Sequence, residues 1–366
     1  MSLSKNNVLE GSDGWLFLNG GNHHPFEYLQ SKKYVNNLVK EAFVDNHLSR
    51  FDYCNRKKIK YSHVVFPSKP LVRRDKLPKT HNAIKPLFDE EYKLDGLEYP
   101  LEILKNIETS FFRTDTHTTP KGSFGIFQHL CKTHFENISF HADYSLRNKK
   151  GDLATMFGMT ETEEYEEFIG LKNHTSAVIK FTNRAGLTGN TGQISYYRNA
   201  LPVINSRVLV FGDSFFEDAL NLQFAHAFKE VLYIRTQFFM YEIIDFYKPD
   251  FVLSGQAERY VPSTKSDANR PFPFIGLLNR NFYEQKNVDQ KFELALSYVM
   301  QSQKDEAGYK KWCHDMDAFA LMRKAKEVST VSSEKALSLI RAARKLVPEN
   351  EYLASLESQF LSISEE

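Results

Sequence analysis

The sequence contains little cysteine. Only three of its 366 residues are cysteines, Cys54, Cys131 and Cys313, and no two of them form a C-x-x-C pair. Three scattered cysteines weigh against a disulfide framework and against a zinc site built from thiolates. The histidines show no H-E-x-x-H or similar ligand spacing either. We therefore expect no metal site.

Neither sign of charge predominates. Lys and Arg number 47 and Asp and Glu number 46, so nothing indicates a nucleic-acid partner or an acidic tail. No apolar run approaches the ~18 residues that a membrane helix needs, and we expect no membrane span. The first residues, MSLSKNNVLEGSDGWLFL, lack the basic and apolar regions of a signal peptide. We expect a cytoplasmic protein, with a periplasmic location as the alternative if the chain is trimmed.

Apolar and aromatic residues are abundant. Hydrophobic residues make up 42% of the chain, with 30 Phe and 18 Tyr, which is ample for a packed core in one large domain or two. Buried-strand patterns alternate with helical ones, the strands being Tyr61 to Phe66, Val208 to Phe211, Glu230 to Arg235 and Asp250 to Gly255. Such alternation predicts an α/β fold with a parallel sheet flanked by helices. Function in such sheets is found at the carboxyl ends of the strands.

The composition changes at about Val288, where strand signals end and four helical stretches follow. In the last two, small and apolar residues line one face, and the pair resembles a tetratricopeptide-like unit. Two interpretations stay open: a helical extension that packs on the main domain, or a module that binds a protein partner. We predict two regions, residues 1–287 and 288–366.

The middle of the chain, from Gly151 to Gly192, is less regular. The stretch GDLATMFGMTETEEYEEF carries an acidic run that we interpret as a solvated face. The stretch NRAGLTGNTGQ, Asn183 to Gln193, is rich in glycine and predicts a mobile or tightly turning loop.

The stretch FFRTDTHTTPKG, Phe111 to Gly122, sets an acid, Asp115, two residues before a base, His117. Thr119 suits the N-cap of the helix that follows, and Pro120 suits its first position. The pair therefore precedes a helix N-terminus. Alone it is weak evidence, because Asp115 could cap the helix and His117 could be a surface or core histidine.

The stretch VFGDSFF places Ser214 after a strand and at the start of a helix. This position exposes the hydroxyl at the sheet edge and directs backbone N–H groups to the same point, as an oxyanion requires. A serine nucleophile needs a base, and the base needs an orienting carboxylate. We expect Asp213 to be structural. The alternative is a plain turn in which Asp213 or Ser214 serves as an N-cap.

Together these segments resemble the alginate O-acetyltransferase group, which has an SGNH-hydrolase-like domain. The resemblance covers most of residues 10 to 265, and its motifs keep the group's order and spacing. They are GSDGWLFL, VVFPSKP followed by DKLP, RTDTHTTPKG, VLVFGDSFF and FVLSGQAERYV. One departure is Thr118, where the group usually has an aromatic residue.

The resemblance implies Ser214 as nucleophile, His117 as general base and Asp115 as the group that orients His117. It implies an O-acetyltransferase that forms an acetyl-serine intermediate and acts on a cell-surface or capsular polysaccharide or its precursor. An SGNH-type acetylesterase, in which water replaces the sugar, and a non-catalytic carbohydrate- or protein-binding scaffold are the alternatives.

The partners follow from this interpretation: a carbohydrate acceptor and an acetyl donor, with no bound cofactor. A cytoplasmic enzyme could draw on acetyl-CoA as the donor, whereas an exported one could not easily do so. Candidates for oxyanion or substrate contacts are Gly189 and Asn190, because glycine lets a backbone approach and an amide can donate, and Thr118 and Arg113, which flank the acid–base pair.

Overall fold

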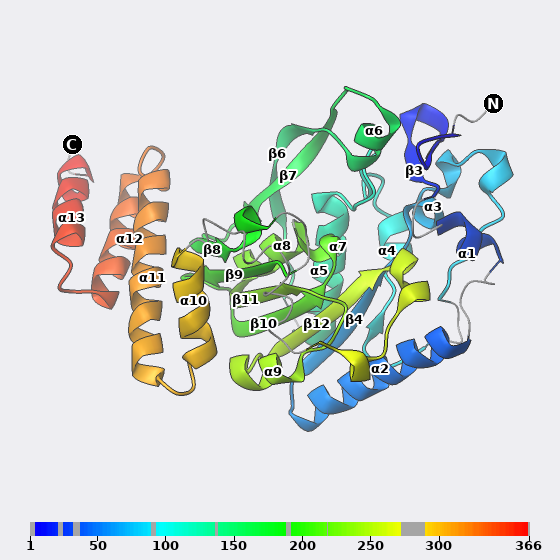
Figure 1. The fold of residues 1–366 in the computed structure, drawn as a ribbon. Helices are drawn as coiled ribbons and strands as arrows, with labels where there is room; N and C mark the ends of the chain where they lie inside the picture. Colours follow the sequence, from blue (N-terminus) through cyan, green and yellow to red (C-terminus); the bar gives the residue numbers. More distant parts are fainter. Residues whose placement is uncertain are drawn as a thin grey trace.

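A seven-stranded β-sheet lies at the centre of the molecule (Figure 1). The computed structural model describes residues 4–20, 25–31, 37–88, 93–135, 138–187, 192–217, 219–271 and 290–364. The strands are β1 Ser4–Lys5, β2 Val8–Glu10, β3 Leu16–Leu18, β4 Lys60–Phe66, β5 Leu97–Glu98, β6 Ala142–Lys149, β7 Glu163–Leu171, β8 Val178–Thr182, β9 Ile194–Asn199, β10 Ile204–Gly212, β11 Phe228–Arg235 and β12 Phe251–Ala257.

Helices cover both faces of this sheet and extend from one end of it (Figure 1). They are α1 Pro25–Ser31, α2 Asn37–Arg56, α3 Lys69–Val72, α4 Leu101–Lys105, α5 Pro120–His134, α6 Asp152–Phe157, α7 Ser214–Glu217, α8 Ala219–Ala227, α9 Tyr241–Tyr247, α10 Gln290–Gln301, α11 Glu306–Val328, α12 Ser333–Leu346 and α13 Glu351–Ser364. None of the described helices is both long and apolar enough to serve as a membrane span.

The order of the strands is β5-β4-β12-β10-β11-β9-β8. The strands from β5 to β11 are parallel, whereas β9 and β8 join the edge in antiparallel orientation. The predicted α/β class is therefore confirmed, and the antiparallel edge pair is an addition to it. Strand β10, which leads to Ser214, lies in the interior of the sheet between β12 and β11.

Alternation along β10 explains why helices are needed on both sides. Val208 and Val210 pack in the cluster that contains α5 and α8, while Leu209 and Phe211 pack in the cluster that contains α9 and α10. Successive side chains of a strand point to opposite faces. A strand that is apolar throughout therefore has to be covered on both faces.

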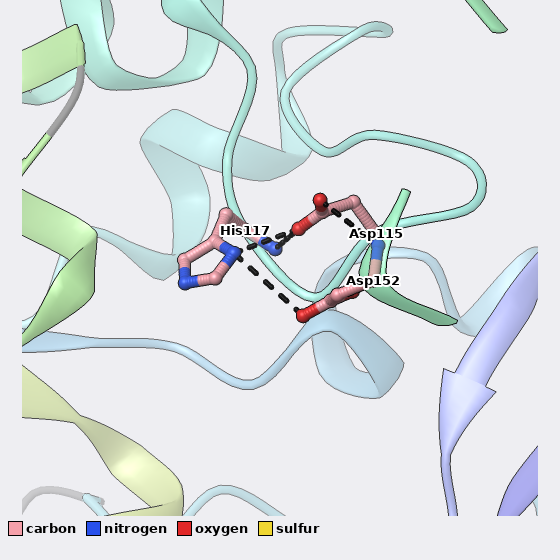
Figure 2. A group of neighbouring side chains, drawn as sticks. All are labelled: Asp115, His117 and Asp152. Carbon is pink, nitrogen blue, oxygen red and sulfur yellow. Dashed lines mark hydrogen bonds and ion pairs between the residues drawn. The ribbon is translucent and has the colours of Figure 1, made fainter. Parts of the chain in front are cut away.

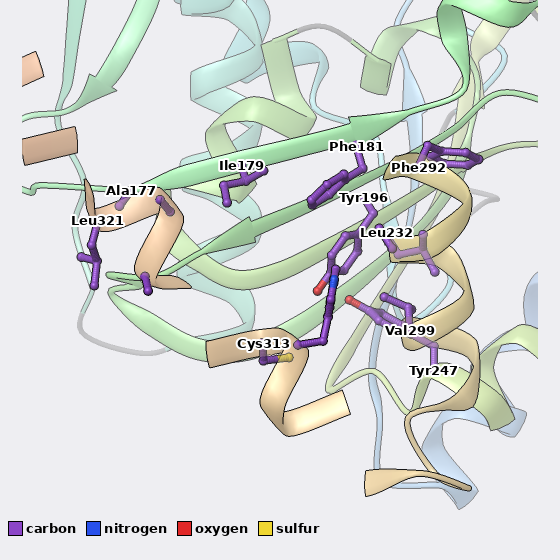
Figure 3. Packing of buried hydrophobic residues seen from close by; sticks show 14 of the residues in the cluster. Ala177, Ile179, Phe181, Tyr196, Leu232, Tyr247, Phe292, Val299, Cys313 and Leu321 are labelled. Carbon is purple, nitrogen blue, oxygen red and sulfur yellow. The ribbon is translucent and has the colours of Figure 1, made fainter. Parts of the chain in front are cut away.

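The C-terminal helices pack on the main sheet. Their apolar residues join the same cluster as Phe181 and Tyr196 of the antiparallel edge strands (Figure 3). The Trp312 ring lies 6.1 Å from each of those two rings. Arg198 of β9 forms an ion pair with Asp317 of α11 at 2.6 Å. Of the two interpretations of this region, packing on the main domain is observed, and a protein partner stays a prediction.

The predicted boundary at residues 287 and 288 lies outside the described residues. The region from Gly151 to Gly192, predicted to be less regular, contains α6, β7 and β8. Strand β7 forms an antiparallel hairpin with the preceding β6, with α6 between the two strands, and β8 joins the main sheet. In Figure 1 this hairpin projects from the sheet toward β3. An isolated two-stranded hairpin is only marginally stable and depends on packing against other parts of the protein. Its strands are therefore hard to recognise from local sequence.

We predict that Trp312→Ala destabilises the whole protein by about 3–5 kcal/mol, because the indole is buried between the sheet and α11. Urea unfolding followed by circular dichroism measures this change. Phe319→Ala on the same helix is the matched control, since Phe319 is 47% exposed and should cost under about 1 kcal/mol. Equal losses in the two variants would contradict an integral role of the helices.

Candidate active site

Ser214 lies at the carboxyl end of β10, where the chain turns into α7. Asp213 shapes this turn: one carboxylate oxygen accepts from the N–H of Phe215 at 3.0 Å, and the other accepts from the N–H of Ala257 at 2.7 Å. Gly212 is required because a Cβ there would lie 2.3 Å from the Phe216 ring. The turn is thereby fixed both to its own helix and to the end of β12, and the predicted structural role of Asp213 is confirmed.

Asp115 and His117 lie in a loop that folds back on itself just before α5. Phe111 and Thr118 form a β-bridge, and the Thr119 hydroxyl caps the helix by accepting from the N–H of Gly122 at 3.1 Å. The predicted N-cap is thus confirmed. Gly122 lets the helix approach this loop closely, because a Cβ there would lie 2.1 Å from the carbonyl oxygen of Ser110.

The structure brings Ser214, His117 and Asp115 together in a hydrogen-bonded chain. The His117 Nε2 and the Ser214 Oγ are 2.9 Å apart, and the His117 Nδ1 and an Asp115 carboxylate oxygen are 2.7 Å apart. The same oxygen accepts from the backbone N–H of His117 at 3.0 Å. Figure 2 shows the Asp115 carboxylate directed at the imidazole ring. If Nδ1 carries the proton, Nε2 is left to accept from the serine hydroxyl.

Asp115 is kept ionised by its surroundings. Only 3% of its side chain is exposed, and burial raises its pKa, but the hydrogen bond from His117 and the nearby positive charges outweigh burial and hold the pKa well below its usual range. Lys149 contributes an ion pair of 3.0 Å to the second oxygen of Asp115. A buried carboxylate with such partners can orient a histidine without taking its proton.

Asp152 is a second carboxylate at the site, and the sequence did not reveal it. It begins α6 and lies 3.9 Å from the His117 Nδ1 (Figure 2). Its oxygens accept from the backbone N–H and the hydroxyl of Thr116 at 2.8 and 2.6 Å. Its ligand oxygens, with those of Asp115 and the His117 ring, are close enough to hold a metal ion. That no metal is needed stays a prediction.

The acidic run that we interpreted as a solvated face is partly buried, which is a correction. Glu163 of β7 is 7% exposed. Its oxygens accept from the backbone N–H groups of Arg113 and Thr114 at 2.7 and 2.9 Å and from the Thr114 hydroxyl at 2.5 Å. The β6–β7 hairpin therefore supplies hydrogen bonds to the loop that carries His117. No local sequence signal distinguishes this glutamate from its exposed neighbours.

A cavity of about 470 Å³ opens over the Ser214 hydroxyl and the His117 ring. Aromatic side chains provide much of its wall, namely Phe112, Tyr165, Phe168, Tyr197 and Phe215. The predicted contact residue Thr118 also lines it and hydrogen-bonds Ser123 at 2.9 Å. This volume is within the range of small-molecule sites.

A larger cavity of about 600 Å³ lies on the opposite face of the sheet. Gly212 and Asp213 line it but Ser214 does not, and its wall also includes apolar residues of β11, α9 and α10 and residues of the segments that follow β11 and β12. The serine hydroxyl therefore faces the smaller cavity.

Of the other predicted contact residues, the structure describes Arg113 only, and Arg113 does not line the cavity. The Arg113 side chain is exposed and lies near Gly14, away from the cavity wall. Gly189 and Asn190, predicted as oxyanion donors, lie outside the described residues. The second oxyanion donor is thus not assigned.

No protein-family model matches this chain, and no curated protein matches it. Among solved structures, Bacillus cereus PatB1 matches with 17% identity over 71% of this chain and 97% of that chain, at a TM-score of 0.48. A DHHW family protein from Eubacterium siraeum matches with 14% identity over 76% and 97%, at 0.47. The O-acetyltransferase domain of Pseudomonas putida AlgJ matches with 17% identity over 75% and 99%, at 0.43. The solved structures that match thus include an O-acetyltransferase domain of the kind that the motifs suggest.

We predict that Asp115 contributes to stability in a pH-dependent way. Because its pKa is lower in the folded protein than in the unfolded chain, the carboxylate stabilises the fold at neutral pH, and this contribution is lost as the pH falls below about 4. The difference in unfolding free energy between the wild type and Asp115→Asn should therefore shrink on acidification. Urea unfolding at pH 7, 5 and 3.5 measures it, with the exposed Asp143→Asn as control. A difference that stays constant with pH would contradict the role given to this charge.

Proposed function

We propose that the protein is an acyltransferase that uses Ser214 as its nucleophile, and specifically an O-acetyltransferase with a carbohydrate acceptor. The observation that carries the proposal is the hydrogen-bonded chain from Ser214 through His117 to Asp115 at the floor of an open cavity. The family resemblance and the O-acetyltransferase domain among the matching solved structures support the acetyl group as the one transferred.

In the first step, the Ser214 Oγ attacks the carbonyl carbon of an acetyl donor. The His117 Nε2 takes the hydroxyl proton as the new C–O bond forms, while Asp115 stabilises the positive charge that develops on the ring. The bond to the leaving group then breaks, and His117 returns the proton to it. The product is acetyl-Ser214.

In the second step, a hydroxyl of the acceptor enters the place of the leaving group. His117 removes its proton as its oxygen attacks the acetyl carbon, and the proton passes back to the Ser214 Oγ when that oxygen departs. The acceptor is thereby acetylated and the serine is regenerated. Water in place of the acceptor would make the same residues an acetylesterase, because both reactions use one mechanism.

The cavity wall suits a sugar. Tyr165 and Tyr197 combine flat apolar rings with hydroxyl groups, and Lys149 and Lys180 add polar atoms at the wall. A ring that is apolar on its faces and polar at its edge would match such a wall. Acetyl-CoA as the donor and a cytoplasmic location remain predictions.

We predict that Ser214→Ala abolishes both acetyl labelling by an activated acetyl ester and turnover of that ester. Intact-protein mass spectrometry measures the label. By analogy with other serine enzymes, kcat should fall by about 10⁶ for Ser214→Ala or His117→Ala and by about 10⁴ for Asp115→Asn. Ser176→Ala is the control, because Ser176 also hydrogen-bonds a histidine, His226, but does not line the cavity. Equal labelling of Ser214→Ala and wild type would disprove the proposal.

The acceptor decides between transfer and hydrolysis. With the acetyl enzyme formed, we expect that adding an oligosaccharide increases the rate of deacylation and yields acetylated sugar, measured by mass spectrometry. Release of acetate alone, at a rate independent of every sugar tested, would indicate an esterase.

A further inference from the structure

Two of the sequence motifs contribute no residue to the proposed triad, yet they pack beside it. The GSDGWLFL motif forms a turn followed by β3, and the VVFPSKP motif forms the end of β4 and the start of α3. The N–H of Leu16 in β3 donates to the carbonyl of Arg113, at 2.9 Å, within the loop that carries His117. Both motifs therefore border that loop.

Lys69 links the two motifs to the loop. Its side chain is 5% exposed, and its ammonium donates to three backbone carbonyls: Leu16 at 2.6 Å, Arg113 at 2.9 Å and Asp115 at 3.0 Å. An ammonium has three N–H donors and no acceptor. The three carbonyls therefore satisfy it completely, and one of them belongs to a member of the proposed triad.

The turn in GSDGWLFL places the Leu16 carbonyl for this contact. Asp13 and Gly14 adopt left-handed backbone angles, with φ of 57° and 72°, and Asp13 forms an ion pair with Lys76 at 2.7 Å. Gly11 is needed because a Cβ there would lie 2.2 Å from the Lys76 carbonyl oxygen. The turn is thus fixed against the segment that follows Lys69.

The surroundings of Lys69 are mostly apolar and partly anionic. The rings of Trp15 and Phe17 lie 5.1 and 5.3 Å from its Nζ. The pKa of Lys69 is lowered to about 7, mainly by burial and to a smaller extent by the guanidinium of Arg73. The carboxylates of Glu163, Asp115 and Asp152 act in the opposite direction and raise the pKa. Burying an ammonium is costly, so its place among backbone carbonyls calls for an explanation beyond packing.

We propose that Lys69 is a positioning residue: it clamps the backbone at Arg113 and Asp115 and so holds the His117 ring in reach of the Ser214 hydroxyl. Asp115 bonds the His117 ring through its side chain while its carbonyl oxygen is held by Lys69, so a shift of this backbone moves the ring. A misplacement of about 1 Å can cost a reaction about 10²-fold. The catalytic consequence rests on the proposed function, whereas the clamp itself does not.

The test compares Lys69→Met, which keeps an unbranched side chain one atom shorter and removes its donors, with the wild type. We expect kcat for an activated acetyl ester to fall about 10²-fold with KM changed less than about threefold. The control is Tyr99→Phe. Tyr99 packs against the apolar cluster that contains Phe17, and the substitution removes one hydrogen bond, to Glu258, that does not involve the loop carrying His117. Thermal unfolding shows how far each variant is destabilised.

A readout independent of turnover is the proton in the hydrogen bond between His117 and Asp115. It is sought as a low-field proton NMR signal and assigned by its loss in His117→Gln. We expect the signal to weaken or shift in Lys69→Met and to persist in Tyr99→Phe. If the signal responds as expected but wild-type protein turns over no acetyl ester, the proposed function fails and the clamp stands.

A folded Lys69→Met variant with an unchanged signal and kcat within about twofold of wild type would overturn the proposal. If Lys69→Met does not fold, the pH profile of the wild type decides. Lys69 loses a proton as the pH rises through about 7, and a neutral amine has only two N–H donors for the three carbonyls. The kcat/KM of the wild type should therefore decline over this pH range, and Lys69→Gln should lack the decline. An alkaline profile that is the same in both proteins would also overturn it.

Discussion

The hydrogen bond between His117 and Ser214 is the interaction on which the rest of the site depends. The two residues are 97 positions apart in the sequence and belong to different segments of the α/β core. Ser214 is fixed by the end of an interior strand, because neighbouring parallel strands hold β10 on both sides. His117 has no such strand beneath it. Its loop has to be held in place by side chains from elsewhere.

Those side chains form two groups, one that accepts hydrogen bonds from the loop and one that donates them. Glu163 and Asp152, from the β6–β7 hairpin and its short helix, accept from backbone N–H groups of the loop. Lys69, the first residue of α3, donates to its carbonyl oxygens. A buried loop needs partners for its backbone groups, and here acidic side chains supply the acceptors and a basic one supplies the donors. The loop is thereby held without regular secondary structure.

Residues of the hairpin and the loop also keep the Asp115 carboxylate ionised. Lys149 on the hairpin pairs with its outer oxygen, and His117 takes its inner one. The hairpin also contributes Tyr165 and Phe168 to the cavity wall. One projecting arm thus forms hydrogen bonds to the loop, forms an ion pair with the carboxylate that we propose orients His117, and lines the cavity that we propose binds substrate. At the far edge of the sheet, the C-terminal helices serve packing and lie away from this cavity.

The sequence by itself determined the parts that depend on local pattern. The apolar run before Ser214 defines its strand, Thr119 and Pro120 define the start of α5, and the spacing of Asp115 and His117 lets a carboxylate reach the imidazole of a near neighbour. Only the tertiary structure decided what holds these parts together. In the sequence, Glu163 and Asp152 cannot be told from solvent-exposed acidic residues. Their hydrogen-bond partners are backbone groups about 50 and 36 residues away, and hydrogen bonds over such separations produce no periodic pattern in a sequence.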